Sequence, residues 1–313
     1  MNVSLTIVHS GHRLLETVFM LDRSGMAKTI DVGYYFVAFI DIVGQRDRLK
    51  QWIKLPGNDD ERENVVRILR DTSEYVKELR VKFDEYFDAV AKSTPLLDNL
   101  KPEQRAWAEQ RKKTILWRRG FSDSYFMTIP CWYESSWGAH SLTIYSCLFG
   151  ICGLFIWALA KKRPFRGALE VDLGTEISKE EVYGPVNVRV SELEKDAKYP
   201  RIIVGTGLLN HLDDLENRCP DNLEGRHTKY CIRDCRNLIT TDHMDAPILD
   251  PMGKGVKSVS GAVDPRMVKL AYEFVVSQEE LFSQSDEKLH GYYGHLRKYF
   301  ESRLALWNLD SIQ

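Results

Sequence analysis

Residues 141–160 contain no charged side chain, and this segment restricts the folds open to the chain more than any other feature. A helix of this length with apolar residues on every side cannot leave any face in water. It is long enough to span a bilayer, and three basic residues follow it at 161–163. Ser, Thr, Tyr, Cys and Gly dilute its hydrophobicity, however, and a helix buried inside a protein has the same pattern. We therefore expect a helix packed on a sheet or at a dimer interface, with a membrane anchor as the alternative.

The composition is that of a folded globular protein, because 43% of the 313 residues are hydrophobic and 28% are charged. No Pro-rich or Gly/Ser-rich linker divides the chain, which favours one domain with insertions. A formal net charge of −2 argues against a basic surface for nucleic acid. The six cysteines lack the dense spacing of a disulfide scaffold and no cleavable signal precedes the first strand, so we expect a cytoplasmic protein.

Four potential zinc ligands, Cys219, His227, Cys231 and Cys235, lie close together in the sequence. A zinc site is one interpretation, but the spacing of the last two cysteines is loose and no second close pair completes a ligand set. We favour free cysteines in a polar surface insertion at residues 218–236.

Apolar runs and turn residues predict strands and helices in alternation along the chain. Expected strands lie at 34–43, 164–171, 182–184 and 201–204, with hairpins at 113–129 and 238–249; expected helices lie at 59–92, 186–198 and, as a closing pair, 265–306. The run at 201–204 has the apolar character of a buried parallel strand. The alternation predicts an α/β (α+β) fold in which helices pack on a mixed sheet.

Two aspartates stand at the ends of predicted strands. Asp41 ends the apolar run 34–43, and Asp123 lies in the turn of the hairpin 113–129. If the two strands are neighbours, the carboxylates converge and repel each other unless cations lie between them. Oxygen ligands suit Mg²⁺ or Mn²⁺, which also bind nucleotide phosphates. The turn after Asp41, formed by Ile42, Val43 and Gly44, offers backbone N–H groups for a small phosphate cradle.

In this order, these segments resemble the class III adenylyl/guanylyl cyclase family, whose members open with an F-x-D-x-x-G strand and carry a second metal aspartate in a hairpin turn. The matching segments are FIDIVG at 39–44, FSDS at 121–124 with Ser122 where the family usually has glycine, RGAL at 166–169, YGP at 183–185 and SELE at 191–194. The resemblance covers roughly residues 34–250.

The resemblance implies a class III cyclase-type mixed or antiparallel sheet flanked by helices. The catalytic domain would span residues 34–256, after an N-terminal extension at 1–33 and before a C-terminal helical segment at 257–313. Insertions would lie at 59–105, which is helical, and at 218–236. Two Mn²⁺ or Mg²⁺ ions would be held by Asp41, Asp123 and the backbone carbonyl of Ile42, with Val43 and Gly44 beside the substrate.

The sequence departs from the family at the residues that stabilise the transition state. Glu192 stands where these cyclases carry an arginine, and Val188 where they carry an asparagine. Arg189 and Arg201 are close enough in the sequence to supply the missing cation, and we assign this role to Arg189. Asn187 would supply the amide after a one-residue shift.

The base-selecting positions also differ from those of purine cyclases. Arg119 stands four residues before Asp123, and Glu181 three residues before Gly184. The guanidinium offers several fixed donors, which suit the carbonyl oxygens of uracil, and Glu181 would orient Arg119 or accept from an exocyclic amine. Two solvated surface charges are the alternative.

These pocket residues are similar to those of the stand-alone pyrimidine cyclases of bacterial Pycsar antiphage systems. The resemblance implies a homodimer with two shared active sites that converts UTP to cyclic UMP, and an effector that senses the product. The alternatives are a cytidylate cyclase that makes cyclic CMP and a degenerate cyclase fold that binds nucleotide as a sensor.

Overall fold

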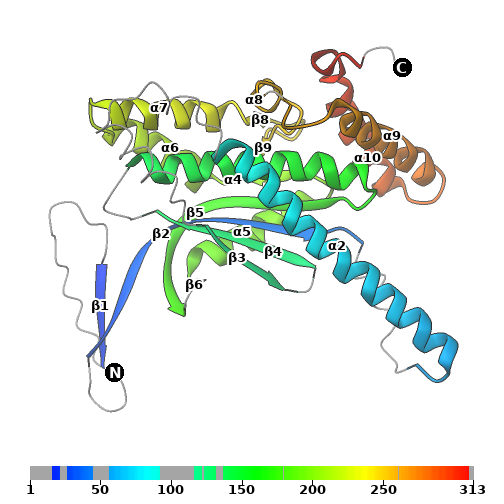
Figure 1. Cartoon of the computed structure of the whole chain (residues 1–313), viewed down its shortest axis with the longest axis horizontal. Coiled ribbons are helices and arrows are strands. Elements are labelled where there is room, and N and C mark those ends of the chain that lie inside the picture. The colour runs from blue at the N-terminus through cyan, green and yellow to red at the C-terminus, as the bar shows by residue number, and fades with distance from the viewer. Residues whose placement is uncertain are drawn as a thin grey trace.

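One mixed sheet organises the molecule (Figure 1). The computed structural model describes residues 16–21, 27–44, 56–91, 116–121, 123–131, 137–178, 180–259 and 261–309. Within these ranges nine strands form one sheet in the order β3-β4-β2-β5-β7-β9-β8, with β1 paired to β2 and β6 to β5. The strands are β1 Glu16–Leu21, β2 Ala27–Ile42, β3 Trp117–Phe121, β4 Ser124–Pro130, β5 Phe165–Ser178, β6 Glu181–Tyr183, β7 Ile202–Val204, β8 Ile239–Thr241 and β9 Pro247–Leu249. β5 and β7 are parallel and the other pairs are antiparallel, which confirms the predicted mixed sheet.

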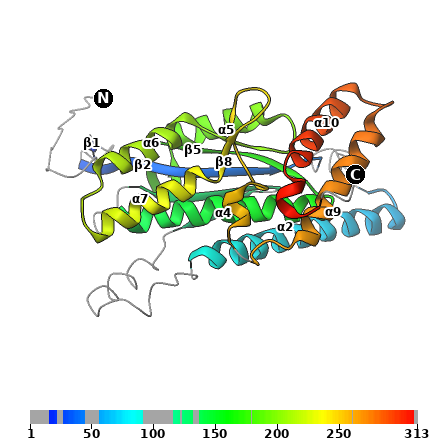
Figure 2. The ribbon, with the colours of Figure 1, turned by 90° about the horizontal axis from the view of Figure 1, so that it is seen from above.

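Helices cover the two faces of this sheet unequally (Figures 1 and 2). The helices are α2 Asp59–Ala91, α4 Trp137–Ala160, α5 Pro185–Ala197, α6 Thr206–Arg218, α7 Leu223–Arg236, α8 Lys254–Lys257, α9 Pro265–Phe282 and α10 Glu287–Glu301, followed by a 3₁₀ turn at Leu304–Trp307. α4 lies on one face with α2, α6, α7 and α9 around it, whereas α5 packs on the other face. The face that carries α5 is the one that positions the candidate site.

β2 is buried on both faces because its side chains alternate between two apolar layers. Phe36 and Ile40 point to the α4 side, whereas Tyr35 and Val37 point to the α5 side, and all four are fully buried. The strand begins at Ala27, earlier than the predicted residue 34, because its first half pairs with β1 and, from Val32 on, with β5.

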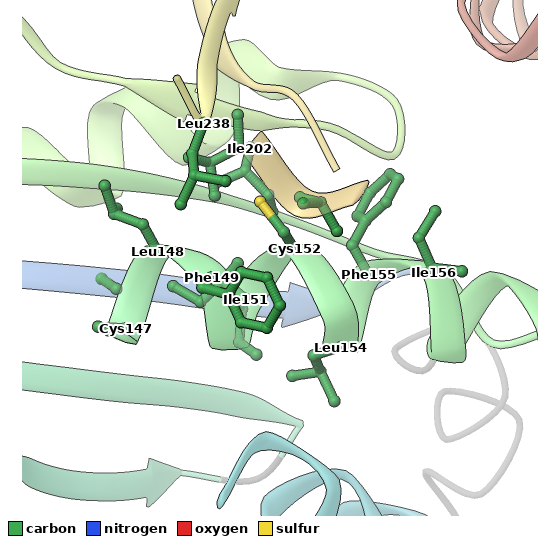
Figure 3. Packing of buried hydrophobic residues seen from close by; sticks show 14 of the residues in the cluster. Cys147, Leu148, Phe149, Ile151, Cys152, Leu154, Phe155, Ile156, Ile202 and Leu238 are labelled. Atoms are coloured by element: carbon green, nitrogen blue, oxygen red, sulfur yellow. The ribbon is translucent and has the colours of Figure 1, made fainter. Parts of the chain in front are cut away.

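The apolar segment that opened the sequence analysis forms the core helix α4. By length and composition the stretch His140–Ala160 is able to cross a membrane, but 94% of its most apolar window is buried inside the protein. Cys152 points toward Ile202 and Leu238, whereas Leu154 points the opposite way, toward α2 (Figure 3). The packing therefore supports the buried helix over the membrane anchor.

The glycines of α4 allow α2 to approach closely. A Cβ atom at Gly153 would lie 2.6 Å from the ring of Tyr86, and one at Gly150 would lie 2.9 Å from the ring of Phe83. The glycines that dilute the hydrophobicity of the segment thus serve helix packing.

Residues 218–236 differ from the expected polar insertion. They contain helix α7, whose Cys231, Ile232 and Cys235 face α4 while its charged residues face outward. One narrow apolar face in a polar segment is the pattern of a surface helix, and the average polarity concealed it. Cys231 Sγ lies 3.3 Å from His227 Nδ1, but no group of three or more potential His, Cys, Asp or Glu ligands gathers anywhere in the described ranges.

The other expected elements agree with the structure. The helix at 59–92, both hairpins, the parallel strand at 201–204 and the closing helix pair are present as α2, β3–β4, β8–β9, β7 and α9–α10. Residues 1–15 and 92–105 of the expected extension and insertion lie outside the described residues.

Candidate active site at the edge of the sheet

Asp41 and Asp123 lie side by side where two neighbouring strands meet the same end of the sheet. Asp41 is near the end of β2, and Asp123 directly precedes β4. β2 and β4 are antiparallel with Asp41 opposite Ser124, so Asp123 comes immediately before the residue that faces Asp41. The N–H of Ile42 donates to the carbonyl of Asp123 at 3.3 Å, which fixes the two turns against each other. The structure therefore brings together the two acids that the sequence singled out. Ser122, which precedes Asp123 in the chain, lies outside the described residues.

The Asp41 carboxylate is only 26% exposed and has two polar neighbours. Ser124 Oγ donates to its Oδ1 at 3.1 Å, and Arg166 Nη2 lies 3.8 Å from its Oδ2. Burial raises the pKa of Asp41 to about 6, against the Ser124 hydrogen bond and with help from the carboxylates of Glu194 and Asp123. The site thus holds a carboxylate that needs more positive charge than the protein supplies.

Arg166 and Glu194 belong to this site although the sequence did not single them out. Arg166 is paired with Asp41 across β2 and β5, and its Nε donates to Glu194 Oε1 at 2.5 Å. Glu194 comes from α5 and its side chain is 7% exposed. The RGAL segment at 166–169 was the available signal for Arg166, whereas nothing in the sequence indicated that α5 would bring Glu194 into contact with it.

The donor set fits a hard divalent cation. Asp41 and Asp123 offer carboxylate oxygens at one edge, the backbone carbonyl of Ile42 belongs to the same turn, and burial already disfavours the unneutralised charge of Asp41. Two carboxylates and a carbonyl are the kind of partial oxygen shell that Mg²⁺ or Mn²⁺ completes with water and phosphate oxygens. No group of three or more potential His, Cys, Asp or Glu ligands occurs among the described residues.

The phosphate cradle predicted after Asp41 is smaller than expected. The N–H of Ile42 donates to Asp123, and the N–H of Val43 donates to the carbonyl of Pro164 at 2.9 Å, so neither N–H is directed to a ligand in this conformation. Gly44 has a φ of 81°, a left-handed conformation that suits glycine. The prediction that Val43 and Gly44 border the substrate remains open.

Arg119 and Glu181 form the ion pair that the sequence suggested. The end of β5 and β6 curve below β2 and approach β3 (Figure 1), and Arg119 Nη1 lies 2.9 Å from Glu181 Oε2. Ser178 Oγ donates to the same carboxylate oxygen at 2.7 Å, and the hydrogen bonds from Ser178 and Arg119 lower the pKa of Glu181. Both side chains are about half exposed, so they remain accessible to a ligand.

Arg189 lies away from the two aspartates of its own chain. Its Nε is 2.8 Å from Asp172 Oδ2, and Asp172 is six residues along β5 from Arg166, which corresponds to about 20 Å of strand. With 58% of its side chain exposed, Arg189 projects from the face that carries α5.

The other residues of the predicted transition-state region lie at the start of α5 and along its exposed side. Glu192 is exposed, Val188 is 59% exposed, and the Oδ1 of Asn187 is buried without a hydrogen bond from any described residue.

Arg201, the second cation that the sequence offered, is committed to the fold. It is 5% exposed and forms a buried ion pair with Asp242. Its Nε donates to the carbonyl of Ala197 at 3.0 Å and its Nη2 to that of Asp196 at 2.9 Å, so it holds the C-terminal end of α5. This guanidinium is not available to a substrate.

Comparisons with known proteins find similarity to solved structures but not to any family model or curated sequence. No family model matches the chain, and no curated protein matches it significantly in sequence. Among solved structures, the chain is similar to a class III adenylyl cyclase-like ATP-binding protein from Pseudomonas aeruginosa, with 12% sequence identity and a TM-score of 0.32 over 89% of this chain and 72% of that one. A TM-score this low carries no weight for individual residues, so the site rests on the geometry above.

Proposed function

We propose that this chain is a nucleotidyl cyclase that converts UTP into 3′,5′-cyclic UMP and pyrophosphate. The observation that carries the proposal is the placement of Asp41 and Asp123 on adjacent strands, with Arg166 Nη2 3.8 Å from Asp41. Two carboxylates for divalent cations beside a guanidinium are suited to a polyphosphate, whose transfer reactions depend on positioning and charge neutralisation.

In the proposed reaction the ribose 3′-oxygen bonds to the α-phosphorus, the bond from that phosphorus to the pyrophosphate oxygen breaks, and the 3′-hydroxyl proton passes to solvent water. Bound Mn²⁺ or Mg²⁺ would supply charge neutralisation and a more acidic 3′-hydroxyl. The ionised carboxylates of Asp41 and Asp123 would hold the cations. Glu194 holds the Arg166 guanidinium in place, where it would contact a phosphate oxygen.

Uracil is the base that the Arg119 and Glu181 pair suits best. Glu181 and Ser178 hold the guanidinium in place, and its donors have the fixed directions that suit carbonyl oxygens, of which uracil has two and cytosine one. Cytosine is the alternative base. With CTP as the preferred substrate the product would be cyclic CMP instead of cyclic UMP, and the reaction would be the same.

A homodimer with shared sites would complete this machinery. Within one chain Arg189 is paired with Asp172, which lies about 20 Å along β5 from Arg166, the residue opposite Asp41, so we propose that a second copy supplies the guanidinium. Exposed apolar side chains occur on α5 and β6, which carry Arg189 and Glu181, and on the adjoining end of β5, at Leu173, Ile177, Tyr183 and Val188. A matching face on a second copy is the occupant we propose for them.

The biological setting follows from the sequence resemblance alone. Cyclic UMP would act in the cytoplasm as a second messenger of antiphage defence and would be sensed by a separate effector.

Incubation of the full chain with Mn²⁺ and each of the four nucleoside triphosphates tests the proposal. We expect cyclic UMP and pyrophosphate from UTP, a smaller or no yield from CTP, and none from ATP or GTP. Asp123→Ala should abolish turnover in a folded protein. A folded chain that binds nucleotide and yields no cyclic product under any of these conditions refutes the enzyme.

That outcome would favour a nucleotide sensor, and two features of α5 support this alternative. Glu192 replaces the arginine of the related cyclases, and Arg189 is engaged by Asp172. A sensor would bind UTP with a measurable Kd, and Asp123→Ala would weaken the Mn²⁺-dependent part of that binding.

A further inference from the structure

A cavity of about 270 Å³ lies between the β8–β9 hairpin and α10, beside residues 199–202 that precede and begin β7. Of the residues described for the candidate site, Arg201 and its partner Asp242 line this cavity, whereas Asp41, Asp123, Arg166, Glu194, Arg119 and Glu181 do not. Its inner wall is apolar and buried, formed by Phe155, Ile202, Leu249 and Leu296. Thr241, His243, Lys298 and Ser302 form a polar, exposed rim. An apolar interior with a few polar groups at the mouth is the usual construction of a small-molecule site, and this volume suits a small ligand.

The charges around the cavity favour a single negative charge on that ligand. Arg201 is neutralised by Asp242, and Arg303 Nη2 is paired with Asp250 Oδ2 at 3.2 Å. Lys298 makes no ion pair with any described residue, so one positive charge at the mouth remains without a counter-charge.

The side walls favour a flat ring. Tyr199 lines the cavity, with the stacked imidazoles of His243 and His295 beside it, whose centroids are 3.6 Å apart. Aromatic walls of this kind accept a heteroaromatic ring by stacking.

We infer that this cavity is a second ligand site, and that it binds a cyclic mononucleotide with its ring among the aromatic side chains and its phosphodiester at Lys298. A cyclic nucleotide carries one negative charge and one flat ring, as the cavity requires. The choice of cyclic UMP as this ligand rests on the proposed function, whereas the site itself does not.

The cavity is linked to the candidate active site by a continuous set of contacts. Arg201 in its wall holds the last carbonyls of α5, and α5 carries Glu194, which is hydrogen-bonded to Arg166 beside Asp41. A ligand in the cavity would therefore lie against Arg201, the residue that holds the end of α5, and α5 in turn positions Arg166 through Glu194. This is the geometry expected of a site that senses product.

Calorimetric titration of cyclic UMP into the full-length Asp123→Ala variant tests the proposal without turnover. We expect saturable binding that weakens at least tenfold with Lys298→Met, which removes the charge, and with Thr241→Trp, which fills the exposed mouth. Lys288→Met, on the same helix but outside the cavity, should leave the Kd unchanged. Uridine and inorganic phosphate, which each offer half of the ligand, should bind at least tenfold more weakly than cyclic UMP.

Binding that is absent, or that is insensitive to both cavity changes, overturns the second site, because product held at Asp41 would not respond to Lys298 or Thr241. Circular dichroism of each variant separates loss of binding from loss of fold. If the wild type makes cyclic UMP that the cavity does not bind, only this inference fails. If the cavity binds added cyclic UMP and no triphosphate is cyclised, only the proposed function fails.

Discussion

Asp41 is the residue at which function and stability oppose each other. Its pKa of about 6 in the folded protein exceeds the ordinary value of 3.8, so its ionised form destabilises the fold. The difference corresponds to about 3 kcal/mol at neutral pH. The penalty is fully present above about pH 6 and fades as the pH falls toward 4, where the carboxyl group is largely protonated in the folded chain and increasingly so in the unfolded one.

Asp41→Asn should therefore stabilise the metal-free protein while it abolishes turnover. In EDTA at pH 7.5 we expect the free energy of unfolding to rise by up to about 3 kcal/mol, and the gain to shrink between pH 6 and pH 4. Denaturant unfolding at several pH values measures it. A variant that is less stable than the wild type at pH 7.5 would show that Arg166 and Ser124 outweigh the burial of the charge.

Arg119 should act on the base and hardly on the fold. Arg119→Met removes a half-exposed ion pair, and because solvent screens such pairs the Tm should change little. We expect a tenfold or larger rise in the KM for UTP and a smaller preference for UTP over other triphosphates.

Arg118→Met is the matched control, because Arg118 is the preceding residue on β3 and pairs with Asp84 instead of Glu181. Equal changes in KM for both variants would contradict the role of Arg119.

At the scale of elements, the Arg201–Asp242 pair joins α5 to the β8–β9 hairpin. Asp242→Ala leaves a guanidinium that is 5% exposed without its counter-charge, which should cost about 3–5 kcal/mol of unfolding free energy. Asp214→Ala removes the partner of Arg218 in an exposed pair within α6 and should cost less than about 1 kcal/mol. Chemical denaturation of both variants compares them, and similar losses would mean that the buried pair does not tie these elements together.

The elements that the sequence predicted are those whose periodicity is local. β2, α2 and the β3–β4 hairpin carry their signals within one stretch of chain. The pairing of β2 with β4, which places Asp41 beside Asp123, is not local, and only the resemblance to the cyclase family implied it. α7 was hidden by its polar average, and α6 was not predicted. Glu194 near Asp41 and the burial of Arg201 depend on how α5 lies across the sheet, which no local pattern specifies.

At the scale of the whole molecule, the proposed dimer would bury a face that includes β6 and the start of α5. Tyr183 and Val188 are 70% and 59% exposed, and charges there should oppose a dimer that buries this face. We expect Tyr183→Asp with Val188→Asp to yield folded monomers without cyclase activity, measured by light scattering and product assay.

Leu281→Asp is the control, because Leu281 is an apolar residue of α9 that is 62% exposed and lies outside β6 and α5. This change should alter neither the mass measured by light scattering nor the cyclase activity. Active monomers of the double variant would contradict the shared site.

The burial of α4 has a consequence for the making of the protein. Its cover includes α7 and α9, which come later in the chain, and about a hundred residues separate the end of α4 from Pro265. At a synthesis rate of about 5–20 residues per second, the last of this cover is made about 5 to 20 s after α4. During that interval an uncharged helix able to span a bilayer is open on the side that α9 will occupy. During synthesis we therefore expect the exposed side of α4 to bind chaperones or the membrane-insertion machinery. This exposure ends when α9 is made and packs on α4.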